Sequence, residues 1–306
     1  MNIQSIFAIT DFSTRAEQGL ERAALLAHAH QATLSVMYAT ETPNPKFSDP
    51  FARLEQRARQ LARRHTIRVK TVARTGRMVD DILKQCQRSN LLVLDQRGHR
   101  SLWQFWQGST QDQILRHSAC PILVVKKPVM RPYHRLLVAV DQTETSKDLV
   151  QHASGFALDA ELELFHALYD LDEAWPSSHV MTSEAVNAYR ERAHRNARDR
   201  LFRFTDSSHA RRNRVNAVVG RGEPARLTVV QQEATKADLI VVGKERSSTL
   251  IDLLLGSVAN RIAQWANSDV LVVPNGYQAP SSAAAAARIQ ALPDQHRGRL
   301  QWVTGR

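Results

Sequence analysis

Residues 91–127 decide the fold, because the chain contains this segment twice. They read LLVLDQRGHRSLWQFWQGSTQDQILRHSACPILVVKK, and residues 239–275 read LIVVGKERSSTLIDLLLGSVANRIAQWANSDVLVVPN. The two segments align without a gap at an offset of 148 residues. The identical positions are Leu91, Val93, Leu102, Gly108, Ser109, Ile114, Leu123, Val124 and Val125. A Gly-Ser pair at the same distance from two apolar runs indicates an internal duplication.

The duplication extends to the beginning of each half. Residues 6–11 form an apolar run that ends in Asp11, and residues 135–141 form another that ends in Asp141. Short apolar runs that end in a polar turn are typical of central strands in a parallel sheet, which are buried on both faces. A helical spacing of apolar residues follows each run. The candidate N-caps of these helices are Ser13 or Thr14, and Thr143 or Thr145.

Strand and helix patterns alternate through both halves. In the first half we expect strands near residues 3–10, 33–39, 67–73, 91–95 and 121–126, and helices near 14–30, 50–64, 77–88 and 109–117. In the second half we expect strands near 135–140, 161–168, 214–219, 238–242 and 269–273, and helices near 145–158, 180–205, 224–235 and 257–266. This alternation predicts an α/β fold with two tandem doubly wound, Rossmann-like domains. We place domain 1 at residues 1–130 and domain 2 at 131–276, and expect a disordered basic tail at 277–306.

Charge and composition narrow the functional classes. The formal charge of +11 is uneven, because residues 1–130 carry 19 basic and 10 acidic side chains while residues 131–276 carry 18 and 19. The basic first half suggests nucleic acid, but its arginines are not interleaved with aromatics, which favours solvated helix faces. No apolar stretch is long enough to cross a membrane, and the opening residues resemble a strand rather than a signal peptide. Cys86 and Cys120 lack a metal-ligand spacing and fit a reducing cytoplasm, where we expect the protein.

Three features of each half should meet at one edge of its sheet. Ligands of open parallel sheets bind beyond the carboxyl ends of the strands, where the strand order reverses. The features are the acid after the first strand, the loop after the fourth strand, and the Gly-Ser pair that opens the last helix. A helix N-terminus offers free amides and a positive dipole end, which suit a phosphate, and glycine lets the phosphate approach. Ser257 or Ser109 could equally serve as a simple helix cap.

These residues resemble the universal stress protein family, whose nucleotide motif is Gly-x2-Gly-x9-Gly followed by Ser or Thr. The second half reads Gly243-x2-Arg246-x9-Gly256-Ser257, and the first reads Asp95-x2-Gly98-x9-Gly108-Ser109. The turn at residues 222–224 and the last strands CPILVV and SDVLVV add to the resemblance, which covers about residues 3–126 and 134–274. It implies adenine nucleotide α-hydrolase-like domains, each with a five-stranded parallel sheet in the order 3-2-1-4-5. It also implies an intrachain pseudo-dimer through the last strands, and a further homodimer of the whole chain.

The resemblance implies ATP or another adenine nucleotide as ligand, with Mg²⁺ accompanying ATP. In the second half the implied site residues are Asp141, Gly243, Arg246, Gly256, Ser257 and Val258. In the first half they are Asp11, Gly98, Gly108, Ser109 and Thr110. We expect no resident metal site and no catalytic residues.

Each half departs from the motif at one glycine. Some members of the family bind ATP and others do not, so the resemblance leaves nucleotide binding by this chain open. Arg246 could crowd its loop or clamp a phosphate, because a guanidinium matches phosphate geometry. Asp95 would repel a triphosphate. The leading hypothesis is therefore a nucleotide-responsive stress regulator that acts by binding, with the second half favoured. The alternatives are a scaffold that binds proteins without nucleotide, and a nucleic-acid binder that uses its basic surface.

Overall fold

The computed structural model describes residues 2–40, 48–95, 118–128, 131–141, 143–168, 183–204, 214–244, 257–278 and 302–303. The chain separates into two compact units. We call the unit built on Asn2–Pro132, with Tyr277 and the described residues after it, the first domain. The unit built from Tyr133–Glu245 and Gly256–Gly276 is the second domain. Each is described by itself.

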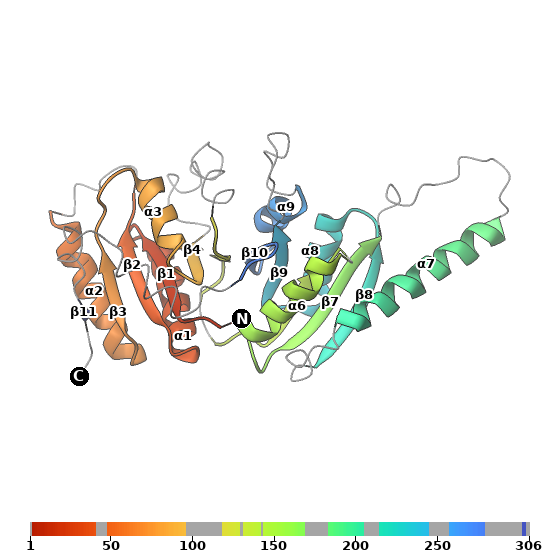
Figure 1. Ribbon diagram of the computed structural model, residues 1–306, viewed down its shortest axis with the longest axis horizontal. Helices are drawn as coiled ribbons and strands as arrows, with labels where there is room; N and C mark the ends of the chain where they lie inside the picture. Colours follow the sequence, from red (N-terminus) through yellow and green to blue (C-terminus); the bar gives the residue numbers. More distant parts are fainter. Residues whose placement is uncertain are drawn as a thin grey trace. The chain divides into compact units, whose positions relative to one another are not determined.

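The first domain alternates strands and helices (Figure 1). Its elements are β1 (Ser5–Thr10), α1 (Thr14–Ala29), β2 (Thr33–Tyr38), α2 (Pro50–His65), β3 (Val69–Val72), α3 (Met78–Cys86), β4 (Leu91–Asp95) and β5 (Ile122–Val125). Five parallel strands lie in the order β3-β2-β1-β4-β5. Central β1 pairs with β2 on one side and with β4 on the other, so that Ile6 aligns with Leu34 and Leu91. The predicted helix at 109–117 lies outside the described residues.

The second domain repeats this plan. Its elements are β6 (Arg135–Ala139), α6 (Glu144–Phe156), β7 (Glu161–Leu168), α7 (Ser183–Arg203), β8 (Val215–Arg221), α8 (Pro224–Thr235), β9 (Leu239–Lys244), α9 (Ser257–Trp265) and β10 (Asp269–Pro274). The parallel order is β8-β7-β6-β9-β10. Numbered within each domain, both sheets have the order 3-2-1-4-5, which confirms the predicted doubly wound fold.

The apolar runs become central strands because helices cover them. Every residue of β4 and of β10 is buried. In the first domain α1 packs against β1 and β4 and buries Leu20, Ala23 and Ala27, which lie on one helical face. Each large aliphatic side chain removed from water in this way contributes about 1.5–3 kcal/mol before entropy is subtracted. The alternation of buried strands and one-sided helices therefore follows from the hydrophobic pattern.

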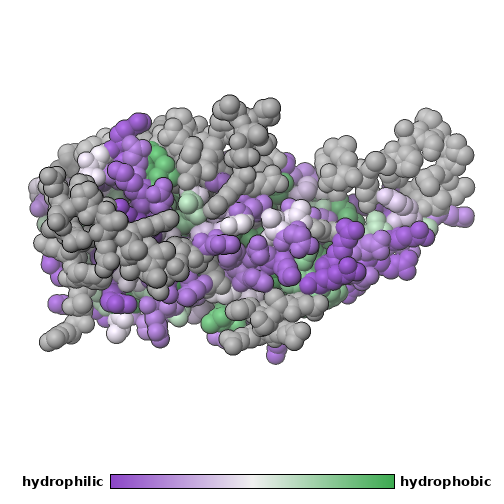
Figure 2. Space-filling model, in the orientation of Figure 1, coloured by the Kyte–Doolittle hydropathy of each residue, from purple (hydrophilic) through white to green (hydrophobic). Residues whose placement is uncertain are grey.

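Helix α7 differs from the other described helices in how little of it is buried. Its buried side chains, Ala197, Leu201 and Phe204 just beyond its end, lie on one face of its C-terminal half. Most of its described N-terminal side chains are exposed, and Figure 2 shows hydrophilic residues over this helix. No helix among the described parts of the chain combines the length and apolarity needed to cross a bilayer.

The C-terminal tail departs from the expectation of disorder at two places. Tyr277 is buried, and its hydroxyl donates to the carbonyl of Asn90 at 3.2 Å. Strand β11 (Trp302–Val303) pairs antiparallel with β3, with Val303 opposite Val69. An unpaired strand edge invites pairing, and two residues of alternating pattern are too short to signal a strand in sequence. Residues 279–301 lie outside the described part.

Candidate functional site

The predicted crevice of the second domain lies where β6 and β9 end side by side. Ala139 of β6 aligns with Val242 of β9. Asp141 stands two residues beyond Ala139, and Gly243 is the residue after Val242. From β6 the chain continues to β7 on one side, whereas β9 leads to β10 on the other side. The strand order reverses between these two strands, which is the position where open α/β sheets bind ligands.

The carboxylate of Asp141 is held by the first turn of the chain that follows it. Its Oδ1 accepts hydrogen bonds from Ser146 Oγ at 2.6 Å, from Thr143 Oγ1 at 2.6 Å and from the Thr143 amide at 3.0 Å. Ser146 Oγ also accepts from the Asp141 amide at 3.1 Å. Burial, the largest single influence, raises the pKa of Asp141, but the Ser146 and Thr143 hydrogen bonds outweigh it and lower the pKa below its usual value. A fixed, ionised acceptor therefore stands at the end of β6.

Gly243 has a local packing reason as well as a place in the motif. A Cβ at this position would lie 3.0 Å from Asn275 Oδ1 and 3.7 Å from Leu149 Cδ2. The backbone amide of Asn275 donates to the Lys244 carbonyl at 2.7 Å, which holds the residue in this position. Any side chain at position 243 would have to displace the Asn275 amide group. Glycine thus keeps the end of β9 narrow.

The other predicted residues of this site are only partly placed. Ser257 begins α9, and Val258 is half-buried against the core cluster that includes Ala139 at its edge. Arg246 and Gly256 lie outside the described residues, as does the side chain of Ser257. The structure therefore brings Asp141 and Gly243 to adjacent strand ends and leaves the phosphate part of the site as a prediction.

The corresponding edge of the first domain is filled differently. Asp11 accepts one described hydrogen bond on Oδ1, from the Ser13 amide at 2.9 Å. Phe12 has a φ of 63°, a strained value for a bulky residue, and its ring stacks on Tyr38 with centroids 4.9 Å apart. The Arg53 guanidinium lies over the same ring, 5.1 Å from its centroid. An aromatic-cation stack thus adjoins the acid.

Asp95 ends β4 at the place that Gly243 takes in β9. It is 6% exposed, and its backbone nitrogen lies 3.6 Å from where a Cβ of Gly19 in α1 would be. The first-half motif residues Gly98, Gly108, Ser109 and Thr110 lie outside the described part of the chain. A buried carboxyl group at the end of the fourth strand disfavours an anionic ligand there.

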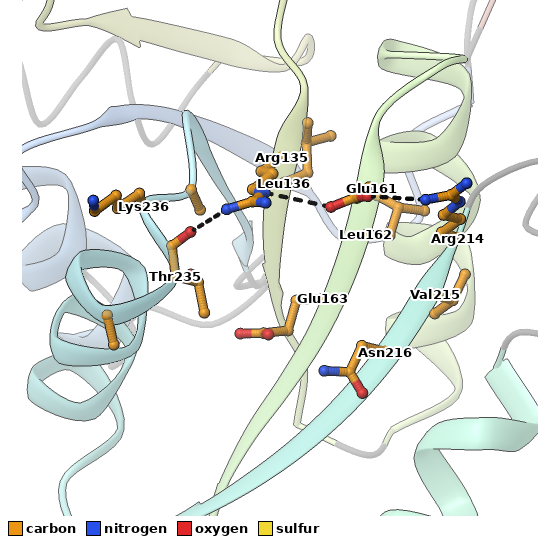
Figure 3. Close-up of a pocket in the computed structure, with 12 residues that line it drawn as sticks. Arg135, Leu136, Glu161, Leu162, Glu163, Arg214, Val215, Asn216, Thr235 and Lys236 are labelled. Carbon is orange, nitrogen blue, oxygen red and sulfur yellow. Dashed lines mark hydrogen bonds and ion pairs between the residues drawn. The ribbon is translucent and has the colours of Figure 1, made fainter.

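A pocket of about 470 Å³ lies at the opposite edge of the second sheet. It is lined by residues where β6, β7 and β8 begin, and by the end of α8. Figure 3 shows Glu161 between Arg135 and Arg214. Arg135 Nε lies 3.3 Å from Glu161 Oε2, and Arg214 Nη1 lies 3.6 Å from Glu161 Oε1. Arg135 also donates to the Thr235 carbonyl at 3.2 Å. Because Glu161 is already paired with two arginines and the pocket lies away from the motif, we do not assign the ligand to this pocket.

Comparison with known proteins agrees with the fold and the repeated motif. The model of the universal stress protein family matches residues 2–126 and again residues 132–274. The chain belongs to the universal stress protein family. Its two matched regions account for most of its length and give it a tandem arrangement.

Curated relatives are other universal stress proteins. One from Mycolicibacterium smegmatis is 24% identical over 228 residues, covering 70% of this chain and 71% of the relative. Universal stress protein Rv2623 of Mycobacterium tuberculosis is 27% identical over 185 residues, so that the match spans 54% of each chain, or about half of the relative.

Solved structures share the fold along nearly the whole chain. A functionally unknown protein of Pseudomonas aeruginosa superposes with a TM-score of 0.62 at 20% identity, covering 93% of this chain and 95% of that one. A universal stress protein of Archaeoglobus fulgidus gives 0.60 at 17% identity, covering 89% and 96%. At such identities the likeness shows the fold of this universal stress protein.

Sequence reasoning missed several residues at the two strand edges. Ser146 and Asn275 were not identified, although the first orders Asp141 and the second fixes the space beside Gly243. The run Thr143-Glu144-Thr145-Ser146, which begins two residues after Asp141, was the available signal for a hydroxyl cage. Thr143 does occupy the N-cap, but its hydroxyl bonds Asp141 rather than a helix amide. Ser13 is the true side-chain cap of α1, accepting from Ala16 at 3.1 Å.

Proposed function

We propose that this universal stress protein binds an adenine nucleotide, ATP first, at the β6–β9 crevice of the second domain. In this proposal nucleotide occupancy biases the protein's shape or its partners, and the protein regulates a stress response by binding rather than by catalysis. The observation that carries it is the contrast at one position. In the second domain the fourth strand ends with Gly243, next to the strand that leads to the ordered Asp141 carboxylate. In the first domain the buried Asp95 takes the position of Gly243.

Each part of the nucleotide has an assigned neighbour in this proposal. Asp141 accepts a hydrogen bond from the adenine or the ribose. The bond between its Oδ1 and Ser146 holds the carboxylate in place, and an ionised carboxylate accepts strong hydrogen bonds. Gly243 lets the ribose approach the end of β9. Gly256 and the first turn of α9, with Ser257 and Val258, receive the phosphates through free backbone amides.

A matched pair of variants tests the assignment. Asp141→Asn removes the charge of the acceptor and should weaken ATP binding about tenfold, the lower range for a charge-assisted hydrogen bond. Asp11→Asn makes the same change in the first domain and should leave the affinity within about twofold. Calorimetric titration gives both affinities, and melting temperatures show whether either variant has lost its fold. Equal losses in both variants, or no binding by the wild type, would reject the proposal.

A scaffold without nucleotide is the second candidate. It is favoured by the buried Asp95 and the stacked Phe12 and Tyr38, which occupy the corresponding edge of the first domain. Mass spectrometry of small molecules released from the purified protein separates the two candidates. An adenine nucleotide at near one equivalent supports the first, and protein that fails to bind added ATP supports the second.

Nucleic-acid binding is the third candidate, and α7 is the described surface that favours it. Arg190 and Arg195 of this helix line a pocket of about 470 Å³ together with Arg221 at the end of β8. Glu191 lies in the same lining and reduces the positive charge. If this surface binds DNA, affinity should fall steeply with salt, in proportion to the number of phosphates neutralised. A weak or salt-independent signal excludes this candidate.

A further inference from the structure

The second helix of each domain is rich in arginine, and in the first domain acids of the first helix pair with these arginines. Arg57 of α2 donates to Glu17 and Glu21 of α1 at 2.6 and 2.9 Å. Glu21 also accepts a hydrogen bond from Arg64 at 2.6 Å. Carboxylates within the first domain therefore neutralise the cations on this side of α2.

The first helix of the second domain lacks both of these acids. Helices α1 and α6 align at an offset of 130 residues, which is also the offset between the acids that follow the first strands. At this offset Lys147 stands at the position of Glu17, and Gln151 stands at the position of Glu21. At these two positions α6 therefore offers α7 a cation and an amide, whereas α1 offers α2 two carboxylates.

A pocket of about 470 Å³ lies between α7 and the ends of β7 and β8. Its described lining consists of the last residue of each strand and four residues of α7, namely Leu168, Arg221, Arg190, Glu191, His194 and Arg195. The ring Nε2 of His194 lies 3.2 Å from the Val219 carbonyl oxygen. Because a carbonyl oxygen can only accept, Nε2 is the donor, and this bond ties α7 to β8 at the pocket.

Positive charge predominates in this pocket. Three of its lining residues are arginines, and among the described residues Glu191 is the acid that faces them. Within the described part of the chain Arg195 takes part in no ion pair. In the pocket of Figure 3, by contrast, Glu161 pairs with two arginines. Cations held around one recess repel one another, so an anion that enters the recess relieves this repulsion.

We propose that this pocket binds a compact anion that carries two or more phosphate groups, such as inorganic triphosphate or a small polyphosphorylated molecule. A guanidinium can bind two phosphate oxygens in parallel, and three guanidinium groups around one recess can hold more than one phosphate. In the sheet, β7 and β8 lie on the side of β6 that is away from β9, so the pocket is separate from the β6–β9 crevice. The inference does not rest on nucleotide binding in that crevice.

A DNA duplex fits this pocket less well than a compact anion does. A duplex presents one phosphate charge per roughly 1.7 Å of its axis, so it would contact cations along the exposed side of α7 rather than in one recess. Arg192 of α7 is exposed and lies outside the lining. Binding of a compact anion should therefore depend on Arg195 and not on Arg192, whereas binding of a duplex should depend on both.

Calorimetric titration of the whole chain with inorganic triphosphate, at one low salt concentration, tests the inference. Arg195→Gln removes a guanidinium from the pocket and should weaken binding about tenfold, because a charge-assisted hydrogen bond is lost. Arg192→Gln is the matched control. It removes the same charge from the same helix outside the pocket, and it should change the affinity by less than about twofold.

A third variant should strengthen binding. Glu191→Gln removes the carboxylate that repels the anion, and the affinity for triphosphate should rise about threefold. All three side chains are exposed, so the melting temperatures of the variants should stay near that of the wild type.

Hydrogen exchange read by mass spectrometry locates the bound anion. Phosphates held between α7 and the ends of β7 and β8 should slow amide exchange in residues 183–203 of the wild type. At the same triphosphate concentration Arg195→Gln should lose this protection, and Arg192→Gln should keep it.

Several outcomes would overturn the inference. One is a wild-type protein that does not bind triphosphate at millimolar concentration. Another is wild-type affinity in all three variants, because triphosphate would then occupy a different site. Equal losses in Arg192→Gln and Arg195→Gln would indicate a diffuse cationic surface, and a short DNA duplex whose binding shows the same equal losses would assign α7 to nucleic acid instead.

Discussion

The two domains have the same strand order but place different chemistry at the end of the fourth strand. In the second domain Gly243 keeps that end narrow, and three hydrogen bonds hold the neighbouring Asp141 carboxylate. In the first domain the same end holds the buried Asp95, and Phe12 stacks on Tyr38 beside Asp11. A duplicated fold has thus kept its strand order and changed the side chains at this edge. The comparison teaches that one fold can carry different chemistry at the same strand ends within one chain.

The largest effect should come from transplanting the first-domain residue into the second domain. Gly243→Asp places a carboxylate next to the loop that we predict to hold the phosphates, and puts a Cβ 3.0 Å from Asn275 Oδ1. We expect ATP binding to weaken roughly 30-fold or more, because repulsion of an anion at a few ångström near a protein surface amounts to about 2 kcal/mol or more. Calorimetric titration measures the loss. Gly243→Asn, which is similar in size but uncharged, separates crowding from charge.

The reciprocal change tests whether the first domain can regain a site. Asp95→Gly removes the buried carboxyl group from the end of β4. If the aspartate alone blocks the crevice, the variant should bind a second equivalent of ATP. Unchanged stoichiometry would mean that the Phe12–Tyr38 stack also occludes this edge.

The next effect concerns Arg246, where the second domain departs from the family motif. We propose that it clamps a phosphate, because with Lys244 close by in sequence an extra cation favours a bound anion. Arg246→Gly should then weaken ATP binding by about 1–3 kcal/mol, the range for a charge-assisted contact. Titration at one fixed salt concentration decides the matter. Tighter binding by the glycine variant would show that the arginine blocks the site.

The fourth effect concerns the turn before the third helix, which differs between the two domains. Asp81 accepts from the Thr75 and Gly76 amides at 2.8 and 2.9 Å and from Thr75 Oγ1 at 2.9 Å, whereas Glu223 caps α8 in the second domain. Burial, the largest influence, raises the pKa of Asp81, but these hydrogen bonds outweigh it and lower the pKa. The stabilisation is therefore fully present above the unfolded value of about 3.9, and it is lost as pH falls through the lower folded value.

Asp81→Asn should remove this contribution from the first domain. We expect a loss of about 1–3 kcal/mol at neutral pH and a weaker dependence of stability on pH below about 4. Hydrogen exchange read by mass spectrometry assigns the loss to residues 69–95 rather than to the second domain. A uniform destabilisation of both domains, or an unchanged acid transition, would contradict the assignment.

We expect the smallest effect from a substitution that makes the surroundings of Asp141 resemble those of Asp11. Ser146→Ala puts alanine where the first domain has Ala16, and it removes the hydroxyl that bonds both Oδ1 and the amide of Asp141. We expect a cost of about 1 kcal/mol in stability. The pKa of Asp141 should move upward, because a donor to its ionised form is lost. NMR titration of the carboxyl carbon measures the shift, and a pKa that stays unchanged would assign the ordering to Thr143 instead.

The sequence by itself determined the architecture. Two copies of an apolar strand, a Gly-Ser pair and another apolar strand, separated by 148 residues, were sufficient to predict duplicated α/β domains. The strand order 3-2-1-4-5 followed from the family resemblance and is the observed one. These features are readable because hydrophobic burial depends on local period and on which runs are apolar throughout. The positions of Asp141 and Gly243 at adjacent strand ends follow from the same topology.

Only the tertiary structure decided how those ends are filled. The contacts of Ser146 with Asp141 and of Asn275 with the space beside Gly243 join residues whose types and spacing carry no periodic signal. Tyr277, predicted to lie in a disordered tail, is buried because its hydroxyl reaches the Asn90 carbonyl, 187 residues away. Whether a hydrogen bond or a close contact forms depends on differences of a few tenths of an ångström in the distance between two segments far apart in sequence. Those distances are set by packing of the whole domain, not by any local pattern.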